Sequence, residues 1–189
     1  MLTRQAFWFL RHGETDWNAQ NLAQGRVDIP LNATGRAQAD AAAARLHGRG
    51  IRSIVASPLS RARDTALTAA AVIGAEVTYD PELQEVSFGD HEGQPMLTQW
   101  FDDWVAEKYT PPGAESFAEL RDRAVRAVNR CLLQEAPVLV VAHGALFRAL
   151  RSAMGLEPNI RTANGIPIFC EPGAPDAAWT LIAAADIVP

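Results

Sequence analysis

The 189-residue chain has little lysine, little cysteine and no long apolar run, and each of these shortages excludes a class of protein. Lys108 is the only lysine among 17 basic residues, and 22 acidic residues bring the net charge to −5. Nucleic acids and anionic membranes are bound through a concentrated basic face, so this acidic chain is not expected to bind either. An anionic ligand must therefore be held by a local cluster of charges.

Cys131 and Cys170 are the only cysteines, and they lie far apart in the sequence. Their separation excludes a disulfide scaffold and favours a reducing, cytoplasmic setting. Nowhere do about 18 uncharged apolar residues run together, so no membrane span is expected. The composition, 48% hydrophobic and 21% charged, predicts one globular domain over residues 1–189. The sequence gives no reading of the oligomeric state, and a homo-oligomer stays open.

Apolar runs of strand length alternate with helical patterns along the chain, which predicts an α/β fold. The apolar runs are continuous, which is typical of strands buried on both faces in a mostly parallel sheet. They span residues 7–10, 54–56, 77–79 and 138–142, and the helical patterns span 36–47, 60–72, 119–133 and 145–154. Two further apolar segments, 166–169 and 179–183, predict an antiparallel edge element.

Two helix starts carry capping signals. Ser57 followed by Pro58 is typical of an N-cap with proline at the first helical position. Ser116 and Glu119 form a capping-box pattern.

Between these helices, the segment 93–115 combines prolines with four aromatic residues. We interpret it either as a surface helix pinned to the core by its aromatics or as a lid that shapes the mouth of a pocket.

Two histidines follow the carboxyl ends of predicted strands. His12 comes after Arg11 at the end of the first strand, and His143 precedes Gly144 at the end of the fourth. In an open parallel sheet ligands bind outside these ends. A glycine after each histidine would let a ligand approach the backbone closely. Arg61, in the first turn of a helix that follows another strand, would reach the same rim and complete a small cationic pocket.

Such a pocket suits phosphate chemistry. Arginine supplies paired, charge-assisted donors to the non-bridging oxygens of a tetrahedral dianion. A neutral imidazole can attack phosphorus and carry the phosphoryl group. A second imidazole, protonated, can stabilise the charge of the transferring group. The leaving oxygen then needs a proton donor that lies outside the phosphate cradle.

Five motifs in order across residues 7 to 150 make this expectation specific. They are RHGETDWN from Arg11, GRVDIPL with TG and QA from Gly25, SPLSRARDTA from Ser57, LQE with FG from Leu83, and VAHG ending at Gly144. Together they resemble the motifs of the histidine phosphatase superfamily, the phosphoglycerate mutase-like group. The resemblance implies a three-layer α/β/α fold with a mostly parallel sheet. It also implies catalysis without a metal or another cofactor.

The resemblance assigns catalytic roles to five positions. His12 is the implied nucleophile, which becomes phosphohistidine. Arg11, Arg61 and His143 are implied to line the phosphate pocket around it. Glu85 matches the acid of the family, which protonates the leaving group and then deprotonates the attacking water.

Four further positions are expected to bind substrate. Asn18 and Thr15 occupy places where the family contacts the transferring phosphate or orients the pocket. Backbone N–H groups near Gly144 are expected to contribute. Arg26 is close in sequence to the phosphate loop and is the ambiguous member of this set.

Several functions stay open at this point. The favoured one is a metal-independent phosphomonoesterase that acts on a small phosphorylated metabolite. Its rival is a mutase, but the family's cofactor-dependent mutases tend to carry a basic insertion, whereas residues 93–116 contain only Lys108 as a base. A catalytically inactive binding module is a third reading. A fourth takes His12, Glu14, Asp16 and His143 as metal ligands.

The remaining arginines are interpreted as compositional. Eight arginines on predicted helices or at their ends are explained by solvated faces and i,i+4 pairs. These eight are Arg36, Arg45, Arg49, Arg63, Arg121, Arg123, Arg126 and Arg130. We expect them to tolerate replacement by lysine.

Overall fold

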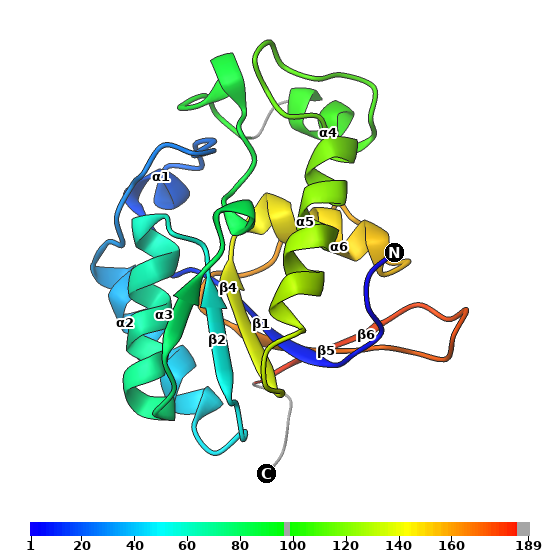
Figure 1. Cartoon of the computed structure of the whole chain (residues 1–189). Helices are drawn as coiled ribbons and strands as arrows, with labels where there is room; N and C mark the ends of the chain where they lie inside the picture. Colours follow the sequence, from blue (N-terminus) through cyan, green and yellow to red (C-terminus); the bar gives the residue numbers. More distant parts are fainter. Residues whose placement is uncertain (97–98, 185–189) are drawn as a thin grey trace.

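A six-stranded sheet in the order β3-β2-β4-β1-β5-β6 lies between helices on both of its faces (Figure 1). The computed structural model describes residues 1–96 and 99–184. The strands are β1 (Phe7–Arg11), β2 (Ser53–Ala56), β3 (Val77–Tyr79), β4 (Val138–Ala142), β5 (Pro167–Glu171) and β6 (Thr180–Ala183). The helices are α1 (Asp16–Ala19), α2 (Ala33–Leu46), α3 (Ser60–Ile73), η1 (Pro81–Leu83), η2 (Gly89–His91), α4 (Gln99–Val105), α5 (Phe117–Cys131) and α6 (Gly144–Ala153). The expected three-layer α/β/α fold is confirmed.

The sheet combines a parallel part with an antiparallel edge. Strands β3, β2, β4 and β1 pair in parallel, as their continuous apolar runs predicted. Strand β5 runs antiparallel to β1, and β6 runs antiparallel to β5. The two apolar segments near the end of the chain therefore form the expected antiparallel edge.

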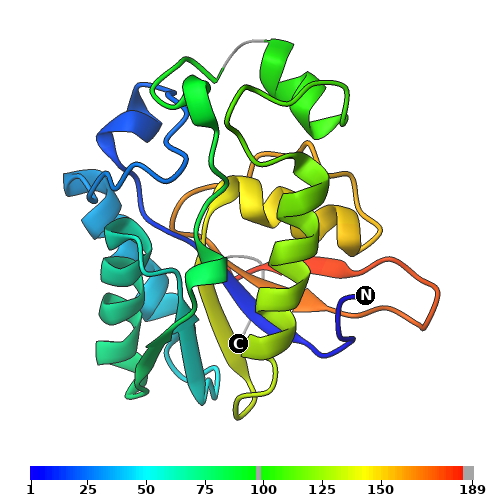
Figure 2. The same cartoon turned by 45° about the horizontal axis from the view of Figure 1, so that its top comes forward.

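Alternate residues of the central strands build two separate cores. Phe7 and Phe9 of β1 point to the face that α5 and α6 cover, whereas Trp8 and Leu10 point to the face that α2 and α3 cover. This follows from the two-residue period of a strand. The two helix pairs are visible on either side of the sheet in Figure 2. Helices therefore cover the core on both faces of the sheet.

The two predicted caps have different outcomes. Ser116 forms a full capping box with Glu119 at the start of α5, as predicted. The prediction for Ser57 is wrong, because α3 begins at Ser60. The carboxylate of Asp28 accepts hydrogen bonds from the Ser60 backbone N–H and hydroxyl, both at 2.8 Å, and supplies the cap from a distant loop.

Aromatic contacts fasten the segment 93–115 to the body of the molecule. Phe88 lies edge-on to Trp100, Phe101 and Trp104 at centroid distances of 5.4, 6.0 and 5.3 Å. The indole N–H of Trp104 donates to the carbonyl oxygen of Glu115. Residues 97 and 98 of this segment lie outside the described residues. The aromatic pinning is observed, and movement of the segment as a lid stays a prediction.

Within the described part of the chain, no helix has the length and apolar character needed to cross a membrane. Cys131 and Cys170 are both free and buried. Burial raises the pKa of the Cys131 thiol to about 12, so this thiol stays protonated at neutral pH.

Candidate active site

The pairing of β1 with β4 brings the two histidines together. Arg11 lies opposite Ala142 in the parallel register, and the backbone N–H of His12 donates to the carbonyl of Ala142 at 3.0 Å. His12 and His143 therefore leave the sheet side by side, with ring centroids 5.2 Å apart. Strand position alone, read from the sequence, placed these two residues correctly at one edge of the sheet.

The imidazole of His12 is held in one tautomer. Its Nδ1 lies 2.6 Å from the carbonyl oxygen of Gly13, which can only accept a hydrogen bond, so Nδ1 carries the proton. Burial, with the nearby charges of Arg61 and Arg11, lowers the pKa of His12 well below its ordinary value. The ring is therefore neutral at neutral pH and its Nε2 holds a free lone pair, which is the form that a nucleophile requires.

His143 is fully buried against Ser57. Its Nε2 lies 2.7 Å from the Ser57 hydroxyl. Its Nδ1 has no hydrogen-bond partner among the described residues. Burial and the charge of Arg61 lower the pKa of His143 well below its ordinary value, so the protonated form expected from the sequence is wrong for the ligand-free protein. When the Ser57 hydroxyl donates to Nε2, the proton of the neutral ring lies on Nδ1, and this N–H is the group that the ring can offer to an anion.

Backbone carbonyls hold the two arginines of the pocket. Arg11 donates from Nη1 to the carbonyl of Thr162 at 2.5 Å, and Arg61 donates from Nη1 and Nη2 to the carbonyls of Val27 and Gly25, each at 2.8 Å. Within the described chain, the Nε atom of each guanidinium is buried without a partner. Burial lowers the pKa of Arg11 to about 10, so the group remains charged at neutral pH. Two fixed cations thus keep unused donors in a buried site.

Glu85 meets the first turn of α6. Its Oε1 accepts the backbone N–H groups of Val86 and Leu146, both at 3.0 Å. Its Oε2 accepts the N–H of Ala145 at 2.9 Å. The helix that follows His143 therefore fixes this carboxyl group. No sequence pattern predicted this contact, because α6 starts about 60 residues after Glu85 in the chain.

These groups open onto a cavity of about 220 Å³. Arg11, His12, Asn18, Arg61, Glu85 and Gly144 line it, as the sequence predicted. His143 was also expected to line it, but its fully buried side chain is not part of the cavity wall. Its outer wall was not predicted and includes Phe88, Phe101, Arg148 and Arg161. Arg148 lies one helical turn after Gly144, and this spacing could have indicated it. Arg161 lies in a loop, where no periodic signal exists.

Two predicted substrate-binding residues lie elsewhere. Thr15 does not contribute to the cavity wall and instead caps α1, where its hydroxyl accepts the N–H of Asn18 and donates to Gln24. Arg26 also lies outside that wall, and its Nε donates to the main-chain carbonyl of Glu85 at 3.3 Å. Both residues lie close to the site, but local hydrogen bonds hold their side chains outside the cavity wall.

The glycines beside the histidines make room for protein as well as for a ligand. A Cβ on Gly13 would lie 2.2 Å from the carbonyl oxygen of Gly35, so the absence of a side chain lets α2 pack against the loop. A Cβ on Gly144 would lie 3.2 Å from the Arg11 guanidinium. For Gly13 the packing of α2 is thus one reason for the glycine, and close approach of a ligand stays a prediction.

One helical arginine is misassigned by the sequence pattern. Arg123 of α5 is only 8% exposed and pairs with the Glu115 carboxylate, with Nη2 at 2.6 Å from Oε2. The expectation of a solvated face is wrong at this position, because the polar partner comes from outside the helix. Arg126 and Arg130 of the same helix do lie at the surface.

The metal-binding reading has no support in the geometry. Across residues 1–96 and 99–184, no three His, Cys, Asp or Glu side chains converge to hold a metal ion. Glu14 accepts a hydrogen bond from Asn32, and Asp16 is exposed in the first turn of α1.

Fold and site together define the class: an α/β protein whose paired histidines and arginines form a cationic pocket at the carboxyl edge of a parallel sheet. Residues 7–166 match the family model for the histidine phosphatase superfamily, branch 1. The chain belongs to the histidine phosphatase superfamily.

The named relatives include both a probable mutase and a phosphatase. A probable phosphoglycerate mutase GpmB from Serratia proteamaculans is 36% identical over 87% of this chain and 77% of its own. A glucosyl-3-phosphoglycerate phosphatase from Mycolicibacterium vanbaalenii is 34% identical over 92% and 82%. Among solved structures, a mycobacterial glucosyl-3-phosphoglycerate phosphatase in complex with VO3 has a TM-score of 0.80 and 31% identity, covering 95% of this chain and 98% of its own.

Proposed function

We propose that this protein is a phosphomonoesterase that hydrolyses a small phosphate ester through a phosphohistidine at His12, without a metal. One observation carries the proposal: a neutral imidazole with a free Nε2 lies in a buried pocket with two guanidiniums whose Nε donors are unused. Charge-assisted donors and a preset nucleophile are what phosphoryl transfer requires of a protein.

In the first step the Nε2 lone pair of His12 attacks phosphorus and the bond to the ester oxygen breaks. The electron pair leaves on that oxygen, which takes a proton from Glu85. Oε1 already accepts two N–H groups and Oε2 accepts one, so Oε2 is the atom with a lone pair left to carry the proton. The carbonyl of Gly13 stabilises the positive charge that develops on the His12 ring.

In the second step water attacks the phosphohistidine. Glu85 takes a proton from the water, the N–P bond breaks, and its electron pair returns to Nε2. Arg11, Arg61 and the Nδ1–H of His143 stabilise the charge on the equatorial oxygens. The products are orthophosphate and the free enzyme.

A mutase is the alternative, because one relative is named a probable phosphoglycerate mutase. It would use the same phosphohistidine but return the phosphoryl group to a second hydroxyl. The segment 93–115 favours water as the acceptor, since its described residues line the cavity with Met96, Phe101 and Asp102 and with no basic side chain.

Hydrolysis of p-nitrophenyl phosphate in excess EDTA tests the proposal. Wild-type protein should release phosphate, and His12→Ala should not. His47→Ala, which changes an exposed histidine, is the matched control and should keep full activity. Undiminished turnover in His12→Ala would exclude the nucleophile, and loss of wild-type turnover in EDTA would favour a metal. Interconversion of 2- and 3-phosphoglycerate stimulated by 2,3-bisphosphoglycerate would overturn the choice of hydrolysis.

Glu85→Gln tests the acid. With a good leaving group the phosphoenzyme should still form and should accumulate, because its hydrolysis lacks a base. With an alkyl leaving group the rate should fall by about 10²-fold or more. An unchanged rate with the alkyl ester would exclude Glu85 as the acid.

The outer wall supports an ester whose organic part carries a second anion. Arg148 lies over the ring of Phe101 at 5.0 Å and donates to Asn159. Neither Arg148 nor Arg161 forms an ion pair in the described part of the chain. A carboxylate on the substrate would supply the missing counter-charge. The phosphoglyceryl compounds in the names of the relatives carry this group.

Two esters that differ at this group test the preference. We expect phosphate release from 3-phosphoglycerate to exceed that from glycerol 3-phosphate, in which an alcohol replaces the carboxylate. Arg148→Met should reduce the ratio of the two kcat/KM values by about tenfold, the loss of one charge-assisted bond. Equal ratios in wild type and Arg148→Met would exclude this role for Arg148.

A further inference from the structure

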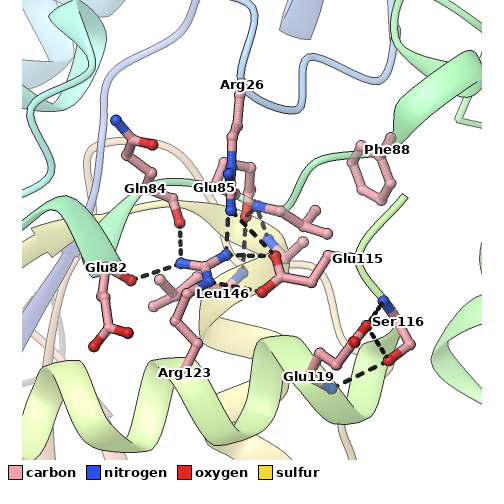
Figure 3. A network of polar contacts seen from close by, with 12 residues as sticks. Arg26, Glu82, Gln84, Glu85, Phe88, Glu115, Ser116, Glu119, Arg123 and Leu146 are labelled. Carbon is pink, nitrogen blue, oxygen red and sulfur yellow. Dashed lines mark hydrogen bonds and ion pairs between the residues drawn. The ribbon is translucent and has the colours of Figure 1, made fainter. Parts of the chain in front are cut away.

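Arg123 is a buried cation that lies behind the candidate site. It is 8% exposed and does not line the cavity. Its guanidinium donates to both Glu115 carboxylate oxygens, from Nε at 2.7 Å and from Nη2 at 2.6 Å (Figure 3). A buried charge is costly unless it is paired in good geometry, and this bidentate contact meets that condition.

The remaining N–H groups of the Arg123 guanidinium donate to main-chain carbonyls around Glu85, the proposed acid. Nη1 donates to the carbonyls of Glu82 and Gln84 at 2.6 and 2.8 Å. Nη2 also approaches the carbonyl of Glu85 at 3.4 Å. Gln84 to Phe88 join η1 to η2 without regular structure, so no sheet or helix ladder fixes these peptides. Arg123 fixes them instead.

Glu115 connects this fork to a second arginine. Its Oε2 lies 3.6 Å from Nη2 of Arg26, whose Nε donates to the same Glu85 carbonyl at 3.3 Å. Its backbone N–H donates to Ser87 at 2.9 Å. We call Arg26, Glu115 and Arg123 the backbone clamp. Figure 3 shows the clamp beside Glu85 and Leu146.

The clamp and α6 hold Glu85 at two different points. The clamp binds the main-chain carbonyl, while the N–H groups of Ala145 and Leu146 bind the carboxylate. A displacement of about 1 Å in a reacting group can cost about 10²-fold in rate. The main chain of Glu85 must therefore be fixed if its Oε2 is to meet the leaving oxygen.

We propose that Arg123, with Glu115 and Arg26, is a positioning residue that sets the Glu85 carboxyl group for proton transfer. The inference rests on the proposed function, in which Glu85 is the acid. It gives the clamp a role that differs from simple stability. A clamp that positions the acid matters most when the leaving oxygen needs a proton.

Arg123→Lys is the decisive variant, because lysine keeps the charge but cannot reproduce the planar fork. We expect its kcat/KM for an alkyl phosphate to fall by about 10²-fold, while that for p-nitrophenyl phosphate stays within about threefold of wild type. Glu85→Gln should show the same dependence on the leaving group. Arg121→Lys is the control, since Arg121 lies on the same helix in an exposed ion pair with Glu107.

Glu115→Gln is the second variant, which keeps the shape of the clamp but removes its negative charge. It should lower kcat/KM for the alkyl phosphate relative to that for p-nitrophenyl phosphate, by a smaller factor than Arg123→Lys. If Arg123→Lys does not fold, Glu115→Gln tests the positioning role. Equal losses for both esters in the folded variants would overturn the inference and leave hydrolysis standing. Failure of folded wild type to hydrolyse either ester would instead overturn the proposed function, and the inference with it.

Discussion

At the residue scale, the site depends on which arginines are turned inward. Arg11 and Arg61 are both buried, and backbone carbonyls fix their guanidinium groups. In both, Nε is buried and has no hydrogen-bond partner among the described residues. Arg63, two residues after Arg61 on the same helix, points outward and pairs with Asp64. Helix geometry explains the contrast, since neighbouring residues on a helix face different directions.

Lysine at position 11 or 61 should therefore reduce catalysis strongly. Arg11→Lys and Arg61→Lys lose the planar donor set, and we expect kcat/KM for p-nitrophenyl phosphate to fall by about 10²-fold or more. Arg63→Lys should keep the wild-type value. The measurement is initial-rate kinetics on folded proteins. Wild-type rates in Arg61→Lys would show that the free Nε does not meet the substrate.

At the element scale, the residue at which α3 begins decides where the Arg61 guanidinium lies, and the local sequence pattern did not predict that residue. Arg61 lies in the first turn of α3, so the register of that turn decides where its guanidinium lies. The turn is capped by Asp28, which lies 32 residues earlier in the chain. The loop that provides the cap also provides the carbonyls of Gly25 and Val27 that Arg61 binds. One loop thus fixes both the helix and the side chain.

Removal of this cap should affect stability and activity together. Asp28→Ala should lower the free energy of unfolding by about 1 kcal/mol, the usual cost of losing a helix cap. It should also lower kcat/KM, because the first turn of α3 frays. Asp28→Asn keeps an acceptor oxygen and should restore most of both quantities. Urea unfolding and initial rates provide the measurement, and equal stability of the two variants would contradict the assignment.

At the scale of the whole molecule, folding buries two neutral histidines in a cationic pocket. In the folded protein the pKa of His12 and that of His143 are lowered, by burial first and then by Arg61. In the unfolded chain each returns to about 6.5. Below that pH the unfolded chain binds more protons, so stability present above about pH 6.5 is lost as the pH falls.

The free energy of unfolding should fall between about pH 7.5 and about pH 5.5, with a limiting slope near 1.4 kcal/mol per pH unit for each buried histidine. Urea titrations at the two pH values measure this change. His143→Gln should remove about half of the histidine-linked slope. His47→Gln, which replaces an exposed histidine, should leave it unchanged. A wild-type protein of constant stability across this range would contradict the lowered pKa values.

Much of the fold was determined by local patterns in the sequence. The strands at 7–11 and 138–142 follow from continuous apolar runs, and the start of α5 follows from Ser116 and Glu119. The meeting of His12 with His143 also follows, since both come directly after parallel strands. These features depend on side-chain period and chain direction, which the sequence contains.

The remaining features were decided only by the tertiary structure. Ser57 meets His143 across 86 residues, and Arg123 meets Glu85 across 38, so no local pattern links either pair. The same helical spacing that made Arg123 look solvated holds for the exposed Arg130. What separates them is the segment that packs beside each side chain. The sequence by itself determined which residues reach the edge of the sheet. Folding decided which of them are buried and how they are oriented, because burial and hydrogen-bond geometry arise from contacts between distant segments.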